Sequence, residues 1–320
     1  CSGFVNRRSG VRVPQPAPAF RRHDGTGLFF RVTRDRIWAQ SFKAGRRALG
    51  AVLSERDRQA RALAEVTELE IPGPVGPLTA RFHQPETGSD PQGFLLFFHG
   101  GGFTFCDTGT HDALCRQLSY GANIAVLSVD HRLAPEHAWP AQRDDAEVAL
   151  RWLVQIRAET VAERMPLILG GDSAGGYLAL DLARQINREA AGTVAMTCLI
   201  YPLLHLDDGV WKTERASSRP IGRAVVRVIS SRLVQVPPNL LDADAGSDPP
   251  CVLAYGGLAD PVRPDCHAYE AALGAAGVPV WAEEFKTLPH GSANMTPMLA
   301  PARTAINRTA NLLRDALERA

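Results

Sequence analysis

HGGG at residues 99–102 and GDSAG at residues 171–175 are the two stretches that decide the fold. Each follows an apolar run, FLLFF at 94–98 and PLIL at 166–169. Apolar runs of this kind, bounded by glycine, predict buried strands. After Ser173, apolar residues recur at helical spacing, at Tyr177, Leu178, Leu180, Leu182 and Ile186. The second stretch therefore predicts a strand, a sharp turn with a serine at its tip, and a helix.

The same alternation of strand and helix extends through most of the chain. Strands are expected at 66–71, 78–82, 94–98, 124–129, 167–169, 195–201, 251–255 and 280–285. Helices are expected at about 111–120, 144–157, after 173, 265–276 and 300–317. Such alternation predicts an α/β fold with a mostly parallel central sheet flanked by helices.

Two parts of the chain fall outside this alternation. Residues 1–30 are rich in Pro, Arg and Gly and predict an arm, and residues 35–64 follow a helical pattern. We therefore assign 1–64 to an N-terminal arm and cap helices, and 65–320 to the catalytic domain. Within that domain the alternation fails at about 203–248. An insertion of this kind in an α/β core usually covers the active site, so we expect a helical cap there.

Composition excludes several classes of function. The 320 residues are 45% hydrophobic and 22% charged, and the formal net charge is +1, so no strong field attracts nucleic acid or anionic lipid. No apolar run approaches membrane-spanning length and no signal peptide is visible. The six cysteines include no C-x-x-C pair, which fits a reducing compartment. We expect a cytoplasmic protein without membrane or nucleic-acid partners, with a homodimer left open.

A serine at the tip of a turn becomes a nucleophile when a histidine takes its proton and an acid orients that histidine. Asp260 and His290 each follow a predicted strand, in the chain order Ser, Asp, His that accompanies a nucleophile turn of this kind. Taken singly, Asp260 reads as a turn former and His290 as an ordinary loop histidine. Together with Ser173 they predict a catalytic triad.

The HGGG stretch predicts the second half of the site. Backbone N–H groups stabilise the negative oxygen of a tetrahedral intermediate, and here they would come from Gly101 or Gly102 and from Ala174. A plain flexible turn or a phosphate-binding loop is the alternative. A P-loop is excluded because no Gly-Lys-Ser/Thr follows.

No cofactor or metal is expected. His131 and His137 lie near Asp130 and Glu136, but in a loop without the i, i+4 spacing of helical metal ligands. Ordinary hydrogen bonding is the simpler interpretation of these side chains.

Through five motifs that follow one another in the same order, the chain resembles the bacterial hormone-sensitive-lipase-like carboxylesterases of the GDSAG type. Proteins of that family have the α/β-hydrolase fold. The five motifs are HGGGF at 99–103, SVDHRLAPEHAWPA at 128–141, GDSAGG at 171–176, DPV at 260–262 and HG at 290–291. The resemblance covers roughly residues 66–320. It implies a nucleophile at Ser173, a triad completed by Asp260 and His290, oxyanion donors at Gly101, Gly102 and Ala174, and no cofactor.

The chain also departs from that family. Ser292 stands where an aromatic residue usually follows His-Gly, His131 replaces a tyrosine, and Val262-Arg263-Pro264-Asp265 replaces the usual Leu and Arg-Asp-Glu. The resemblance implies hydrolysis of small-molecule esters with short to medium chains. A non-catalytic small-molecule receptor on the same fold, or an amidase, are the alternatives.

Overall fold

The computed structural model describes residues 43–51, 63–158, 164–205 and 237–319. Within these ranges one sheet contains the strands β1 (Ala64–Ile71), β2 (Leu78–Pro85), β3 (Phe94–Phe98), β4 (Ala125–Val129), β5 (Leu167–Asp172), β6 (Met196–Ile200), β7 (Cys251–Gly256) and β8 (Val280–Phe285). The helices are α2 (Asp112–Ala122), α3 (Ala141–Ala158), α4 (Ala174–Glu189), α7 (Arg263–Ala275) and α8 (Ala300–Leu317). Residues 43–51 form a further helix.

The strand order is β1-β2-β4-β3-β5-β6-β7-β8. The pairs β1–β2 and β2–β4 are antiparallel, and every other pair in the sheet is parallel. Strands β3 to β7 are buried at every residue, which explains why they read as unbroken apolar runs rather than as alternating patterns. The predicted α/β fold with a mostly parallel sheet is confirmed.

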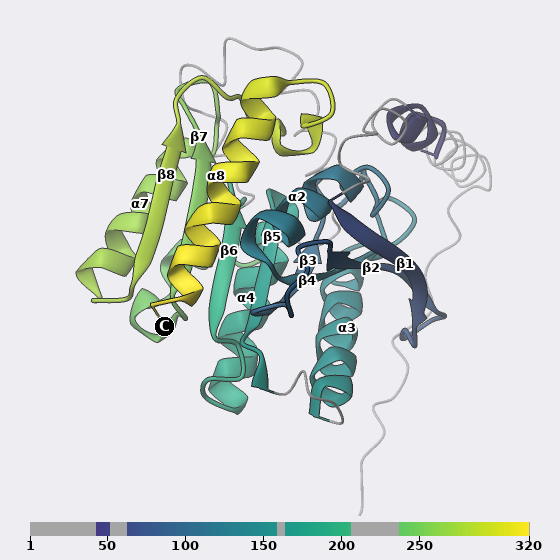
Figure 1. The fold of residues 1–320 in the computed structure, drawn as a ribbon, viewed down its shortest axis with the longest axis horizontal. Coiled ribbons are helices and arrows are strands. Elements are labelled where there is room, and N and C mark those ends of the chain that lie inside the picture. Colours follow the sequence, from purple (N-terminus) through teal and green to yellow (C-terminus); the bar gives the residue numbers. More distant parts are fainter. Residues whose placement is uncertain (1–42, 52–62, 159–163, 206–236, 320) are drawn as a thin grey trace, which may run out of the picture. The chain divides into compact units, whose positions relative to one another are not determined.

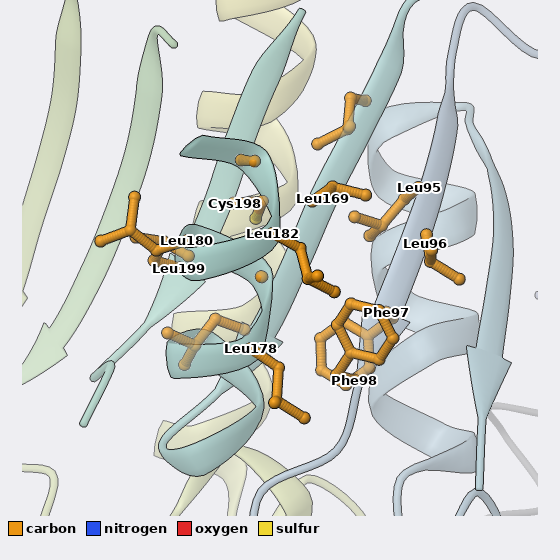
Figure 2. Close-up of a cluster of buried hydrophobic side chains, with 14 of the residues drawn as sticks. Leu95, Leu96, Phe97, Phe98, Leu169, Leu178, Leu180, Leu182, Cys198 and Leu199 are labelled. Carbon is orange, nitrogen blue, oxygen red and sulfur yellow. The ribbon is translucent and has the colours of Figure 1, made fainter. Parts of the chain in front are cut away.

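Helices cover both faces of the sheet (Figure 1). Helices α2 and α8 pack against each other on one face, and α3 and α4 lie on the other. Figure 2 shows how the apolar side of α4 forms the core, with Leu178 and Leu182 directed toward Phe98 and Leu169 of the central strands. This packing fixes the helix that begins directly after Ser173.

Most predicted boundaries agree with the structure within a few residues, with two corrections. The helical pattern expected to run to residue 64 ends earlier, because Ala64 already pairs with Pro85 in β1. The strand expected at 167–169 continues to Asp172. Its glycines suggested a turn, but a Cβ at Gly170 would lie 2.7 Å from the Cys198 carbonyl oxygen, so glycine is needed inside the sheet.

The arm expected over residues 1–30 lies outside the described residues, as does most of the insertion expected over 203–248. The described C-terminal end of that insertion, residues 237–248, contains two short 3₁₀ turns, Leu240–Asp242 and Ala245–Ser247. It is fastened to α4, since the Tyr177 hydroxyl donates to the Pro238 carbonyl at 2.8 Å and Arg184 donates to the Leu240 carbonyl at 2.7 Å.

Candidate active site

The three residues of the predicted triad lie where parallel strands end. Ser173 follows β5, Asp260 follows the end of β7 by four residues, and His290 follows the end of β8 by five. The carboxyl ends of parallel strands share one edge of a sheet, which is where α/β folds bind their ligands. The three residues therefore come together although 117 positions separate Ser173 from His290.

Ser173 adopts a backbone conformation that side chains rarely tolerate, with φ 53° and ψ −117°. Such a conformation costs on the order of 1–3 kcal/mol and persists where surrounding contacts enforce it. Here the Ser173 N–H donates to the Ile200 carbonyl at 2.9 Å, and the Leu203 N–H donates to the Ser173 carbonyl at 2.9 Å. The turn is thus held on both sides by the end of β6.

The glycines of the GDSAG stretch are required by close approach of backbones. A Cβ at Gly175 would lie 1.9 Å from the Phe98 carbonyl oxygen, and one at Gly171 would lie 2.4 Å from the Gly175 carbonyl carbon. The start of α4 therefore lies directly against the end of β3, which brings Ser173 next to the loop that follows β3.

An unbroken line of hydrogen bonds joins Ser173, His290 and Asp260. The distance from Ser173 Oγ to His290 Nε2 is 2.8 Å, and His290 Nδ1 lies 3.0 Å from Asp260 Oδ1. Asp260 Oδ1 also accepts the Val262 N–H at 3.0 Å, which fixes the carboxylate. Asp260 is 3% exposed. This geometry places an imidazole against the serine hydroxyl and a carboxylate behind the imidazole, which is the arrangement that the predicted triad needs.

Burial opposes protonation of His290, but the charge of Asp260, its hydrogen bond and the charge of Asp172 outweigh burial and raise the pKa of His290. The Tyr201 ring lies against the imidazole, with 4.8 Å between ring centroids. The Tyr201 hydroxyl accepts the Ala293 N–H at 2.9 Å and so fastens the loop that carries His290. Sequence reasoning missed Tyr201, whose position at the end of a strand before Pro202 was its only signal.

The loop after β3 presents Gly101 and Gly102 beside the nucleophile turn. Both have positive φ, 104° and 61°, and a Cβ at Gly101 would lie 2.3 Å from the Phe105 carbonyl oxygen. Ala174 is the first residue of α4, where backbone N–H groups have no partner within the helix. In the described part of the chain, and apart from hydrogen bonds within helices and strands, no backbone carbonyl accepts a hydrogen bond from the N–H groups of Gly101, Gly102 and Ala174.

An arginine that sequence reasoning did not identify holds this loop from outside. Arg46, in the helix at 43–51, donates to the Thr104 carbonyl at 2.7 Å and to the Ala134 carbonyl at 2.6 Å. It also forms two hydrogen bonds with Glu136, at 3.0 and 2.9 Å. Nothing in the sequence around Arg46 distinguishes it from neighbouring arginines, because its partners are nearly 60 to 90 residues away.

His99 and His131 lie at the edge of the site and contact the backbone and each other. His99 Nδ1 lies 2.8 Å from the Gly100 carbonyl oxygen, and the His99 ring stacks on His131 with 4.2 Å between centroids. Burial and the charges of His131 and His111 lower the pKa of His99 well below its ordinary value. Among the described residues, no group of three or more His, Cys, Asp or Glu side chains is arranged to hold a metal ion.

An apolar pocket lies on the α8 side of the loop that carries His290. Ser292 is 2% exposed and lines this pocket together with Tyr201, Leu288, Ala302 and Ile306. The residue that replaces the family's usual aromatic therefore faces the protein interior.

The fold agrees with comparisons to known proteins. A family model described as the alpha/beta hydrolase fold matches residues 95–294, which include Ser173, Asp260 and His290. The chain belongs to the α/β-hydrolase fold family. Its core extends beyond the matched residues to β1 and β2 at one end and to α8 at the other.

Curated relatives within this family are esterases. The chain is 35% identical over 269 residues to the esterase LipI of Mycobacterium tuberculosis, an alignment that covers 79% of this chain and 82% of the relative. It is 34% identical over 275 residues to the carboxylic ester hydrolase LipN of the same organism, covering 80% of this chain and 71% of the relative. The resemblance to hormone-sensitive-lipase-like carboxylesterases is confirmed.

A solved structure gives the same result. The hyperthermophilic esterase from the archaeon Pyrobaculum calidifontis is similar with a TM-score of 0.74 and 26% identity, over 88% of this chain and 93% of that one. In the described ranges of the present chain, no helix is long and apolar enough to cross a membrane.

Proposed function

We propose that this chain, a carboxylesterase, hydrolyses short- to medium-chain esters through an acyl-enzyme formed on Ser173. The observation that carries the proposal is the line of contacts from Ser173 Oγ through both nitrogens of His290 to Asp260, at 2.8 and 3.0 Å. Serine needs such a base to attack an ester carbonyl, and the base needs the acid to hold its tautomer.

In the first half of the reaction, Ser173 Oγ attacks the ester carbonyl carbon while His290 Nε2 takes the hydroxyl proton. The imidazolium then gives that proton to the departing alcohol, which leaves an acyl group on Ser173. In the second half, His290 takes a proton from water, and the resulting hydroxide attacks the acyl carbonyl. The proton returns to Ser173 Oγ as the acid leaves. Asp260 stabilises the imidazolium in both halves.

The negative oxygen of each tetrahedral intermediate would accept hydrogen bonds from Ala174 and from Gly101 or Gly102. Each donor of this type contributes about 3–4 kcal/mol to stabilisation of the transition state. The tight contact of Gly175 with the end of β3 supports this assignment, because it sets the Ala174 N–H beside the loop that bears the two glycines.

The alternative of a non-catalytic receptor is less favoured, because such a protein needs no base on its serine. Here His290 lies within hydrogen-bond distance of both partners. An amidase would use the same groups but must protonate a poorer leaving group. The names of the relatives LipI and LipN favour esters as the substrate class.

We further propose that residues 1–64 comprise an N-terminal arm and cap helices, and that the insertion at about 203–248 is a cap over the active site. The insertion carries six basic residues, Lys212, Arg215, Arg219, Arg223, Arg227 and Arg232. Most of them recur at helical spacing and indicate a solvated face rather than a large apolar lid, with Pro220 dividing the segment into two helices. Short chains from acetyl to about hexanoyl should therefore be the best substrates, at roughly 0.8 kcal/mol per buried methylene.

The five described cysteines are free and buried, which supports a cytoplasmic location.

Labelling with a fluorophosphonate and a series of p-nitrophenyl esters test this function together. We expect stoichiometric labelling of Ser173, loss of labelling in Ser173→Ala, and a kcat/KM that is highest between acetyl and hexanoyl. Absence of labelling in a folded protein would favour the receptor. A kcat/KM that still rises at dodecanoyl would contradict the small cap.

A further inference from the structure

Asp172, the residue directly before Ser173, has contacts that the reaction above does not use. It ends β5 and is 3% exposed. Its Oδ1 accepts the Gly100 N–H at 2.7 Å and lies 3.0 Å from His111 Nε2. One carboxylate thus contacts the oxyanion loop and a histidine at the start of α2, while its own backbone carries the nucleophile.

The surroundings of His111 favour protons on both of its ring nitrogens. Nδ1 lies 3.0 Å from Thr110 Oγ1, and that hydroxyl donates its own hydrogen to the Asp107 carbonyl at 2.7 Å. The Asp107 carbonyl is the nearer and stronger acceptor for that hydroxyl, which leaves Thr110 Oγ1 to accept from His111 Nδ1. Nε2 faces the carboxylate of Asp172. With this orientation of the Thr110 hydroxyl, the imidazolium donates to both neighbours, whereas a neutral imidazole has one N–H.

The electrostatic surroundings agree with this charge. Burial opposes protonation of His111, but the charge and hydrogen bond of Asp172 and the contacts of Asp107 outweigh it and raise the pKa of His111. His99 faces the ring with 5.7 Å between centroids, and its lowered pKa keeps it neutral. The pair of Asp172 and His111 is therefore close to charge-neutral.

Two other ionisable side chains near Asp172, Cys106 and Tyr201, are kept neutral by burial. Burial raises the pKa of the Cys106 thiol to about 12 and raises the pKa of Tyr201 well above its ordinary value. His290, which also faces Asp260 and the Tyr201 ring, feels the charge of Asp172 as well. Asp172 thus acts electrostatically on the catalytic base, and His111 compensates that action.

Resting on the function proposed above, we infer that Asp172 and His111 are a buried ion pair that positions the oxyanion loop on the nucleophile turn. Asp172 carries Ser173 on its backbone and Gly100 on its side chain, so a single residue sets the distance between the nucleophile and the Gly101 and Gly102 donors. His111 holds that carboxylate in place. It also cancels a negative charge that would otherwise oppose the negative oxygen of the intermediate.

The variants Asp172→Asn and His111→Gln test this role, because each removes one charge and keeps a polar side chain. We expect each to lower kcat for p-nitrophenyl acetate at least about tenfold with KM within about threefold, as for a partial loss of an oxyanion donor. The acidic limb of the pH profile of kcat/KM should shift in opposite directions in the two variants. Asp172→Asn removes a charge that raises the pKa of His290, so its limb moves to lower pH. His111→Gln leaves Asp172 uncompensated, so its limb moves to higher pH.

His83→Gln is the matched control. His83, in β2, is another fully buried histidine beside a carboxylate, with Nε2 3.3 Å from Asp112 Oδ1. Its ring contacts Val126 of β4 and Asp112 of α2 rather than the oxyanion loop. We expect a wild-type kcat and pH limb in this variant. A similar loss in His83→Gln and His111→Gln would overturn the positioning role, as would limbs that move in the same direction.

The outcome for Ser173→Ala separates this inference from the proposed function. If Ser173→Ala is inactive while Asp172→Asn and His111→Gln keep wild-type kcat and pH limbs, only the positioning role fails. If Ser173→Ala keeps activity, the acyl-enzyme function fails first. Nitrogen NMR of the wild-type protein needs no variant to fold. His111 should carry two ring protons at pH 7, and a neutral His111 at that pH would overturn the ion pair.

Discussion

Replacing Asp248 by asparagine should destabilise the protein strongly. This carboxylate anchors the segment at the C-terminal end of the insertion to α4, the helix that begins directly after Ser173. Arg184 of α4 donates to both of its oxygens, at 2.6 and 2.7 Å. The Tyr269 hydroxyl donates to the same carboxylate at 2.8 Å. The side chains of Arg184 and Asp248 are 5% and 0% exposed, so water cannot replace either partner.

The magnitude follows from this burial. Removing one partner of a buried pair leaves the other charge uncompensated, which costs about 3–5 kcal/mol. With a urea dependence of about 3 kcal/mol per molar, the unfolding midpoint of Asp248→Asn should fall by about 1–2 M. Unfolding followed by far-UV circular dichroism in urea measures this shift.

Glu189→Gln is the matched control. It removes a carboxylate that Arg151 binds at 3.1 Å, but there the side chains are 48% and 44% exposed. Exposed pairs contribute little, so this variant should keep the wild-type midpoint. An Asp248→Asn midpoint equal to that of Glu189→Gln would refute the argument from burial.

Three further predictions concern the site. Ser173→Ala, Asp260→Asn and His290→Ala should each lower kcat by several orders of magnitude at unchanged secondary structure, because triad residues act as one unit; near wild-type turnover in Asp260→Asn would exclude its role as the acid. His290 must be neutral to accept a proton, and its pKa is raised. The value of kcat/KM should therefore rise with pH through a midpoint above the ordinary histidine pKa of about 6.5. A midpoint below that value would contradict this prediction. Gly175→Ala should fail to fold or lose activity, because its Cβ would lie 1.9 Å from a carbonyl oxygen. Gly274→Ala in α7, whose Cβ would have nothing within 4 Å, should be at least as stable as wild type, since alanine favours a helix over glycine. Equal behaviour of the two variants would show that the turn can relax.

Local patterns were sufficient to predict the central strands. The run at 94–98 became β3 without a change of boundary, because a strand buried on both faces must be apolar at every position. The same rule failed at the end of β5. Glycine there is a consequence of contact with β6 and with the start of α4, which a local pattern cannot show.

Contacts between distant residues explain what sequence reasoning missed. Arg46 reaches Thr104 and Glu136 across 58 and 90 residues, and its neighbours in the chain carry no trace of that pairing. Asp172 stood inside a recognised motif, but its role depends on His111 and Gly100, which the fold brings to it. Tyr201 reaches the loop of His290 across 92 residues.

The sequence by itself determined the strands, the order of the motifs and the residue types that could carry ester hydrolysis. These properties are local, because apolar runs, glycines and the chain order of Ser173, Asp260 and His290 are read along the chain. Only the tertiary structure decided the distances of 2.8 and 3.0 Å that join those three residues, and which buried charges face the nucleophile turn. Distances and burial depend on how strands far apart in the sequence pair in one sheet, and hydrogen bonding and pKa depend on distance and burial.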